Sequence, residues 1–470
     1  MTAPEAAARG ATERGGWTTE VLADYALSLR GEEIPAPVRE RIGDCLIDLA
    51  GAAAAGRATA AAEIARRTAA RLGAPGAAGL WFGGGRREAA AAAFANSAAA
   101  SALDLDDGHR AAGGHPGAAV LPAVIAVAQE SASPAPDTLA AIAVGYEVGV
   151  RVAAARDFAR LDTLSTGRWG AYGAAAAACR LRGLDRRRTA EALSVAGVLS
   201  PGLSAAGYSR FMGNHAKEGI PWSVLTGLWA TELAASGFTG PLDILDHPDH
   251  FDARRIRAGL GRGFAVEGVY FKPYGCCRWA HAALEALETV MREEGLAAED
   301  LESVEVHTFE RALRLTNEID PVTVEAAQYS LPFGLGLLAA EGREALLPIR
   351  EGSLHHPRAV ALASRVSLRV DPELDRGFPA ETAARVLVRA GGRSHARLCR
   401  HPAGDPARPM DRAALIAKFR HLSRGCFSAA RQEALLAAVG AVPREGAAAL
   451  AELLSAPPDA EGGRTGSLEG

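Results

Sequence analysis

The densest group of polar residues in the chain lies in one short stretch between two alanine-rich segments. It contains Asp104, Asp106, Asp107 and His109, and His115 follows six residues later. Buried carboxylates are costly unless they are paired or hydrogen-bonded, so their presence between apolar segments suggests a purpose. A histidine can accept or donate a proton near neutral pH, and a carboxylate beside it can act as a base. The stretch therefore indicates acid/base chemistry.

Two plainer interpretations of the same stretch stay open. It could be a solvated loop in which an aspartate caps the next helix. The run from Asp104 to Gly108 also partly imitates a calcium-binding loop, but no glutamate stands at the closing position, so we expect no metal site. His115 precedes Pro116, which biases its backbone toward an extended conformation and suits a loop histidine directed into a cleft.

Two lysines are further candidates, because lysine is scarce next to arginine in this chain. Lys217 and Lys272 offer compact positive charges that can hold the carboxylate of a substrate. In an apolar pocket the pKa of a lysine can also fall, which would make it a proton donor. The plainer interpretation is a solvated surface lysine. Lys418 lies in a C-terminal helical pattern and is expected to be structural.

The elements that must position these residues are predicted to be helices through the first 265 residues or so. Apolar residues follow one helical face from Val38 to Ala53, with Pro37 near the helix start. Most later segments lack a broad charged face, as expected of buried helices, and alanine is a strong helix former. The predicted helices cover residues 87–103, 118–129, 138–155, 170–181, 187–199 and 220–235.

The pattern changes after about Glu267. Alternating residues predict strands over 303–308 and 366–370, and Gly391-Gly392 separates two further strand patterns as in a hairpin. Helices are expected near residues 280–294 and 325–340. This part is therefore predicted to be α+β, with an antiparallel sheet.

Helical patterns return from about Asp411, which predicts that the last helices dock on the first ones. The expected fold class is mainly α: a large all-helical domain built from both chain ends, with a smaller α+β lid domain inserted. The predicted boundaries are 17–266 and 406–455 for the helical domain and 267–405 for the lid. Residues 1–16 and 456–470 are expected to be disordered tails.

Composition narrows the class of protein. The chain has 470 residues and a net charge of −4, which does not favour a nucleic-acid partner. Six scattered cysteines without zinc-type spacing predict a reduced, cytoplasmic protein. The N-terminus lacks the apolar core of a signal peptide, and the longest uncharged apolar run is too short to cross a bilayer, so no membrane partner is expected.

Five motifs, in order along residues 17–455, resemble those of the MmgE/PrpD family. Its members include 2-methylcitrate dehydratase, cis-aconitate decarboxylase and iminodisuccinate epimerase. The motifs are Asp104-Leu-Asp-Asp-Gly-His with His115-Pro-Gly, the Gly-Tyr-Glu-Val stretch in 143–151, Ala216-Lys217 with 237–241, Lys272-Pro-Tyr-Gly-Cys-Cys-Arg in 271–281, and Ala-Gln-Tyr-Ser-Leu-Pro-Phe at 327–333.

The resemblance implies a site between the two domains, a homodimer, and no cofactor or metal. Carried over by motif position, the catalytic residues are Asp104, His115, Lys217 and Lys272. Four more residues are expected to bind substrate or to support these side chains: His109, Asp107, His281 and Tyr274. Asp106 is expected to hold the loop in shape.

Some positions depart from the family pattern. Gly108 stands where the family loop carries threonine, and Leu164-Ser165 stands where the decarboxylase has a His-Pro pair. The residues after Lys217 lack a histidine that many members carry, and further family histidine and tyrosine positions near Cys277 and Phe333 are not matched. A substrate less highly charged than cis-aconitate or methylcitrate is therefore expected.

The function expected from these residues is that of a lyase, most simply a dehydratase acting on a small carboxylate. An α-proton would be removed and a β-hydroxyl lost, with the lysines stabilising the enolate-like state. The same residues would serve a decarboxylase or an epimerase, because all three stabilise a carbanion. A non-catalytic small-molecule-binding dimer is the alternative from another class.

Overall fold

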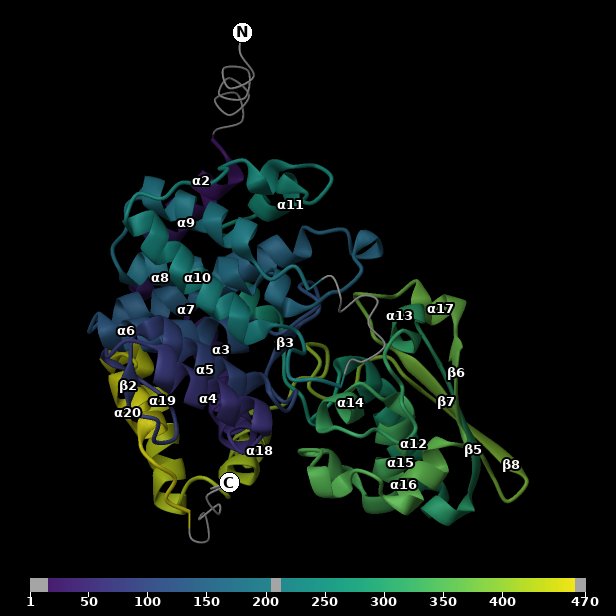
Figure 1. Ribbon diagram of the computed structural model, residues 1–470. Helices are drawn as coiled ribbons and strands as arrows, with labels where there is room; N and C mark the ends of the chain where they lie inside the picture. Colours follow the sequence, from purple (N-terminus) through teal and green to yellow (C-terminus); the bar gives the residue numbers. More distant parts are fainter. Residues whose placement is uncertain (1–15, 204–212, 461–470) are drawn as a thin grey trace.

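The computed structural model describes residues 16–203 and 213–460, and these are mostly helical, with one four-stranded sheet and two short strand pairs. Figure 1 shows two bodies side by side. The helical body combines the first ten labelled helices with the last three, and the sheet body holds the strands β5–β8 and the helices around them. The prediction of a mainly helical chain with a smaller sheet region is confirmed.

Among the described residues, the helical body begins with nine helices whose alanine-rich faces pack closely. Gly145 of one helix and Gly173 of the next lie at such a close approach that a Cβ on Gly173 would meet the Gly145 carbonyl at 2.6 Å. The nine are α2 (Thr18–Ser28), α3 (Ala36–Gly56), α4 (Ala60–Leu72), α5 (Ala89–Ser101), α6 (Pro116–Glu130), α7 (Ala135–Ala154), α8 (Gly170–Leu181), α9 (Arg186–Leu199) and α10 (Ile220–Ala235).

Both ends of the chain share the core of this body. Helices α18 (Arg412–Ser423), α19 (Ala429–Glu445) and α20 (Ala448–Ser455) return to it after the sheet body. Their residues Phe419 and Val439 belong to the same buried cluster as Ile42 and Cys45 of α3. Short elements complete the body: α11 (Ala253–Arg257) and the strand pairs β1 (Ala78–Gly79) with β2 (Arg86–Arg87) and β3 (Gly108–His109) with β4 (Val269–Tyr270).

The sheet body has a core of its own, with the strand order β6-β5-β7-β8. The strands are β5 (Leu301–Thr308), β6 (Val366–Val370), β7 (Ala384–Ala390) and β8 (Arg393–Cys399). Around them lie α12 (His281–Glu294), α13 (Glu310–Leu313), α14 (Val324–Gln328), α15 (Leu331–Glu341), α16 (Pro357–Ala363) and α17 (Pro372–Asp375). The expected helix over 325–340 is two helices, because Ser330 caps the second one through its side chain.

The expectation of a purely antiparallel sheet is wrong for one strand pair. β7 and β8 form the predicted hairpin and β5 pairs antiparallel with β7, but β5 and β6 are parallel. The chain between β5 and β6 runs through four helices, and such a long crossover permits parallel pairing.

The chain ends differ in part from the expected tails. Residues 1–15 and 461–470 lie outside the described residues. Residues 456–460, expected to be disordered, are held: the amide of Asp459 donates to the Cys426 carbonyl at 3.0 Å, and its carboxylate accepts from Ser428. Among the described residues, no helix combines the length and the apolar character needed to cross a membrane.

Candidate active site

The acidic stretch forms a buried loop between α5 and α6, and a short strand pair joins it to the Lys272 segment. Gly108 pairs with Tyr270, and His109 pairs with Val269. A Cβ on Gly108 would lie 2.3 Å from the Tyr270 ring, so the missing side chain makes room for this tyrosine. Two segments that are far apart in sequence thereby become neighbours, and Lys272 comes to lie beside Asp104.

One carboxylate oxygen of Asp104 lies close to two groups that can carry a positive charge. Lys272 Nζ lies 3.1 Å from Asp104 Oδ1, and His115 Nε2 lies 3.4 Å from the same oxygen. Burial alone would raise the pKa of Asp104, but Lys272 and His115 outweigh burial and lower it. Burial would likewise lower the pKa of Lys272, but the Asp104 carboxylate raises it above its usual value. Both groups are therefore held in their charged forms.

His115 lies among three carboxylates. Its Nδ1 is 3.1 Å from Asp106 Oδ2, and its Nε2 is 3.6 Å from Glu218 Oε1 in addition to the contact with Asp104. Burial and Lys272 favour the neutral ring, but Asp106 and Glu218 outweigh them and raise the pKa of His115 well above its usual value. The ring is thus poised as a proton donor.

Lys217 and Glu218 come from the loop before α10. Lys217 has a left-handed backbone, and its ammonium donates to Gln328 Oε1 at 2.7 Å and to the carbonyls of Ser101 and Ala102. Glu218 Oε2 accepts from the amide and the hydroxyl of Thr166, at 3.1 and 2.8 Å. Burial would raise the pKa of Glu218, but His115 and Thr166 outweigh burial and lower it to about 2.

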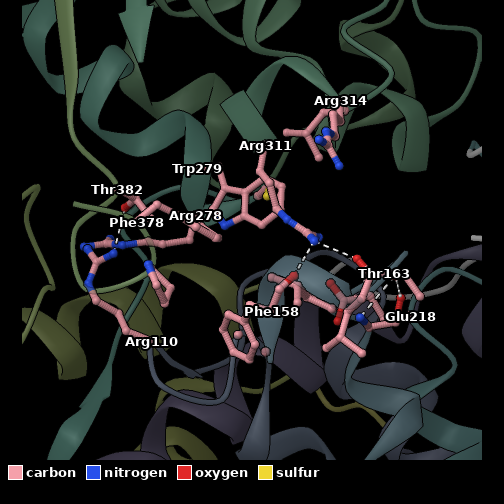
Figure 2. Close-up of a pocket in the computed structure, with 18 of the residues that line it drawn as sticks. Arg110, Phe158, Thr163, Glu218, Arg278, Trp279, Arg311, Arg314, Phe378 and Thr382 are labelled. Atoms are coloured by element: carbon pink, nitrogen blue, oxygen red, sulfur yellow. Dashed lines mark hydrogen bonds between the residues drawn. The ribbon is translucent and has the colours of Figure 1, made fainter. Parts of the chain in front are cut away.

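A cavity of about 360 Å³ opens between the helical body and the sheet body (Figure 2). His115, Lys217 and Glu218 lie in its wall, together with Tyr329. Farther along the wall, both bodies contribute apolar and cationic side chains: Phe158, Leu161 and Leu164 from the helical body, and Arg278, Trp279, Arg311 and Phe378 from the sheet body. The Arg311 guanidinium donates to the carbonyls of Phe158 and Leu161, which ties the two bodies together.

A second cavity, of about 340 Å³, lies on the α4 and α10 side of the same cluster. Asp104, His115, Lys217, Glu218 and Tyr329 line it. Four of these residues line both cavities, so the charged cluster stands at their junction. Lys272 is not among the described residues that line either cavity.

Of the four predicted catalytic residues, Asp104, His115 and Lys272 form one buried cluster. The half-buried Lys217 lines both cavities beside this cluster. The four supporting residues are more dispersed. His109 lines the first cavity, and burial lowers its pKa to about 4, so its ring is neutral. Asp107 accepts from the Tyr146 hydroxyl and the Gly117 amide beneath the loop, away from the described cavity walls. Their roles stay predictions.

The other two supporting residues lie in the core of the sheet body. His281 contacts Arg278, a residue of the first cavity wall, and its ring also bonds to the Cys276 carbonyl. Tyr274 donates to Glu288 and packs against His281. Neither is among the described residues that line the two cavities, so their placement favours support over direct contact with a substrate.

A metal ion is a chemical alternative at the same place. Asp104, Asp106 and His115 each offer one ligand atom, and these atoms lie within 4.8 Å of one another. However, the Lys272 ammonium already supplies positive charge to Asp104, and a cation there would be repelled by it. The donor set fits an ion-pair cluster better than a metal centre, and independence from metal stays a prediction.

Sequence reasoning missed three residues of the junction: Glu218, Tyr329 and Thr166. Glu218 directly follows Lys217, and Tyr329 belongs to one of the five motifs, so both were within reach. Thr166 had no such signal. Its role depends on contacts with residues far away in the sequence. The Thr166 hydroxyl donates to Glu218, 52 residues later, and accepts from the His115 amide at 2.9 Å.

Comparison with known proteins adds an independent finding. Residues 20–257 match the model of the MmgE/PrpD N-terminal domain, and residues 274–442 match that of the MmgE/PrpD C-terminal domain. A cis-aconitate decarboxylase-like protein of Aspergillus oryzae is 27% identical over 309 residues. That match covers 60% of this chain and 63% of the fungal protein, so the chain matches less than two thirds of this relative's length.

Proposed function

This chain belongs to the MmgE/PrpD family, and from that premise we propose that it is a lyase that dehydrates a small hydroxycarboxylate without a cofactor. The observation that carries the proposal is the ion-pair cluster of Asp104, His115 and Lys272 at the junction of two cavities. A buried group of opposite charges with shifted pKa values in a cleft is typical of acid/base sites.

The first step would be removal of the proton next to the substrate carboxylate. Asp104 is the base in this proposal, because Lys272 keeps it ionised and its Oδ2 has no hydrogen-bond partner among the described residues. A carboxylate of low pKa is a weak base, so the carbon acid must be made more acidic. The Lys217 ammonium in the cavity wall would do so by stabilising the negative charge of the enolate-like state.

The second step would be departure of the β-hydroxyl. His115 is the acid, since neighbouring carboxylates favour its protonated ring. Its proton passes to the leaving oxygen as the carbon–oxygen bond breaks and the electron pair of the enolate forms the double bond. The products are water and an unsaturated carboxylate, and the proton on Asp104 returns to His115 through solvent.

Decarboxylation is the second candidate, favoured by the similarity to the cis-aconitate decarboxylase-like protein of Aspergillus oryzae. The same cluster would then stabilise the carbanion left when CO2 departs, and His115 would protonate that carbon. Epimerisation requires only that the proton return to the opposite face. All three reactions depend on the same stabilised carbanion.

A screen of hydroxy and unsaturated carboxylates in D2O, followed by NMR and mass spectrometry, would separate these reactions. Dehydration removes water from the substrate, decarboxylation removes CO2, and epimerisation exchanges deuterium without net loss. His115→Asn and Lys217→Met should each lower kcat by about 10²–10⁴-fold, the usual contribution of a positioned acid or charge. The exposed Glu433→Gln variant is the control and should retain full turnover.

Folded variants with undiminished turnover would contradict the proposal. A wild-type protein that binds carboxylates but converts none of them would instead support the non-catalytic binder.

A further inference from the structure

Glu218 adds a fixed negative charge to the junction of the two cavities. Thr166 holds its Oε2 through two hydrogen bonds, and the Tyr329 hydroxyl lies 3.5 Å from its Oε1. The side chain is 21% exposed, so it faces the cavity space without being free to swing into bulk solvent. Its lowered pKa of about 2 keeps it ionised at neutral pH.

The charge of the whole cluster depends on this residue. The carboxylates are Asp104, Asp106 and Glu218, and the cations are His115, Lys217 and Lys272. With the ring of His115 protonated, three negative charges face three positive charges. A cluster without Glu218 would carry one net positive charge and would suit a second substrate carboxylate.

The remaining wall of the first cavity combines apolar side chains with arginines, most of which already have partners. Arg278 pairs with Asp405, Arg314 pairs with Glu310, and Arg311 donates to backbone carbonyls. Phe158, Leu164, Trp279 and Phe378 can surround a hydrocarbon group. Arg110, another residue of this wall, is paired with Asp405. This wall therefore offers contact area for an apolar substituent, while Glu218 offers a hydrogen-bond acceptor at the inner end.

We propose that Glu218 is a specificity-determining residue that limits the site to substrates with one carboxylate, a hydroxyl facing Glu218 and an apolar substituent. A second carboxylate at the inner end would lie near the fixed charge of Glu218 in a poorly solvated cavity, where like charges repel strongly. The inference rests on the proposed function, because it assigns the substrate class of the same site.

Two acids of nearly equal size test the proposal. They are 3-hydroxy-3-methylbutyrate and citramalate, which differ only by a carboxylate in place of a methyl group. The readout is the ratio of their dissociation constants from calorimetry at neutral pH, or of kcat/KM for an acid that is turned over. Wild-type protein should favour 3-hydroxy-3-methylbutyrate over citramalate by at least about tenfold in this ratio. Repulsion between two like charges in a partly buried site is strong enough to produce such a factor.

Glu218→Gln keeps the shape and the acceptor but removes the charge, so the ratio should fall by about tenfold or more. Glu218→Asp keeps the charge and should stay selective, which guards against a Gln variant that is merely misfolded. Glu433→Gln removes one charge on the distant surface of α19 and should leave the ratio unchanged. The thermal midpoint of each variant reports its folding.

An unchanged ratio in Glu218→Gln, or a wild-type protein that favours citramalate, would overturn the specificity inference. In either of these cases, the proposed function still stands if the Lys217→Met variant no longer binds either acid. If neither acid binds to the wild type or the Gln variant at millimolar concentration, both the inference and the proposed function on small hydroxycarboxylates are overturned.

Discussion

Three aspartates within four residues of each other have three different partners, and their partners set their chemistry. Asp104 faces the Lys272 ammonium, Asp106 faces the ring of His115, and Asp107 accepts from a tyrosine hydroxyl and a backbone amide. Only Asp104 lines a described cavity. The loop thus gives Asp104 the position of a candidate base, whereas Asp106 and Asp107 hold neighbouring groups in place. The sequence alone does not distinguish the three aspartates.

Asp107 should give the protein a distinct pH dependence of stability. Burial raises the pKa of Asp107 to about 7 from 3.8, so the folded state holds this proton longer than the unfolded state does. The contribution of this proton to the free energy of unfolding is fully present below pH 3.8 and is lost as the pH rises toward 7. Asp107→Asn stays neutral, so its free energy of unfolding relative to wild type should rise by a few kcal/mol over this window, at about 1.4 kcal/mol per pKa unit.

Urea unfolding of both proteins at several pH values between 4 and 8 would measure this difference. The exposed Asp243→Asn variant is the matched control, and its stability should stay parallel to that of wild type. Parallel curves for Asp107→Asn as well would show that Asp107 is ionised in the folded protein.

At the scale of elements, periodicity predicted α8 and α10 to the residue, because buried helices carry their apolar pattern in the sequence itself. The parallel pairing of β5 with β6 was not predictable in this way. It depends on a crossover of 57 residues between Thr308 and Val366, and strand alternation is the same for parallel and antiparallel neighbours. Likewise, the fit of Gly108 to Tyr270 joins two distant segments and leaves no local pattern.

Helix α18 bears on the site through one buried lysine. Lys418 Nζ lies 2.6 Å from Asp48 Oδ1 of α3 and donates to the Leu105 carbonyl at 2.7 Å. It therefore links a C-terminal helix, an N-terminal helix and the loop that carries Asp104. Lysine at this position was expected to be structural, and these contacts confirm that expectation for the residue.

Lys418→Met should destabilise the protein by about 3–5 kcal/mol, since Asp48 would be left buried without its charged partner. Adding Asp48→Leu should restore much of this loss, because an apolar pair can replace a buried ion pair. Urea unfolding checks both changes, and kcat of the double variant reports whether the loop keeps its position. Arg420→Met, on the same helix in an exposed pair with Glu433, should cost at most about 1 kcal/mol. Equal losses for Lys418→Met and Arg420→Met would contradict this account.

At the scale of the whole molecule, the first cavity exists because two separately packed bodies meet. Helix α8 belongs to the core of the helical body, whereas Trp279 and Phe378 pack against the core of the sheet body. Asp104, His115, Lys217 and Lys272 were predictable because they lie in recognisable motifs. Glu218 was missed, and so was the apolar wall, since its residues carry no chemical signature. A site divided between two bodies also explains why no single segment of the chain contains the proposed chemistry.

We propose that the outer face of α10 forms the interface of the expected homodimer. Trp222 and Trp229 are seven residues apart on this face, and they are 55% and 58% exposed. Exposed tryptophans of this kind are typical of interfaces. Trp222 also lines the second cavity, so a partner on this face would cover an opening beside Lys217 and Glu218.

Light scattering after size-exclusion chromatography should therefore give a mass about twice the 48.6 kDa of one chain. Trp229→Arg should yield a folded monomer, because a charge at the centre of an apolar contact leaves it without a partner when buried. Its turnover should fall as the second cavity opens to solvent. Leu398→Arg adds the same charge at an exposed position on β8 and should remain dimeric. A dimer that survives Trp229→Arg but dissociates in Leu398→Arg would place the interface on the sheet body and separate dimer formation from the second cavity.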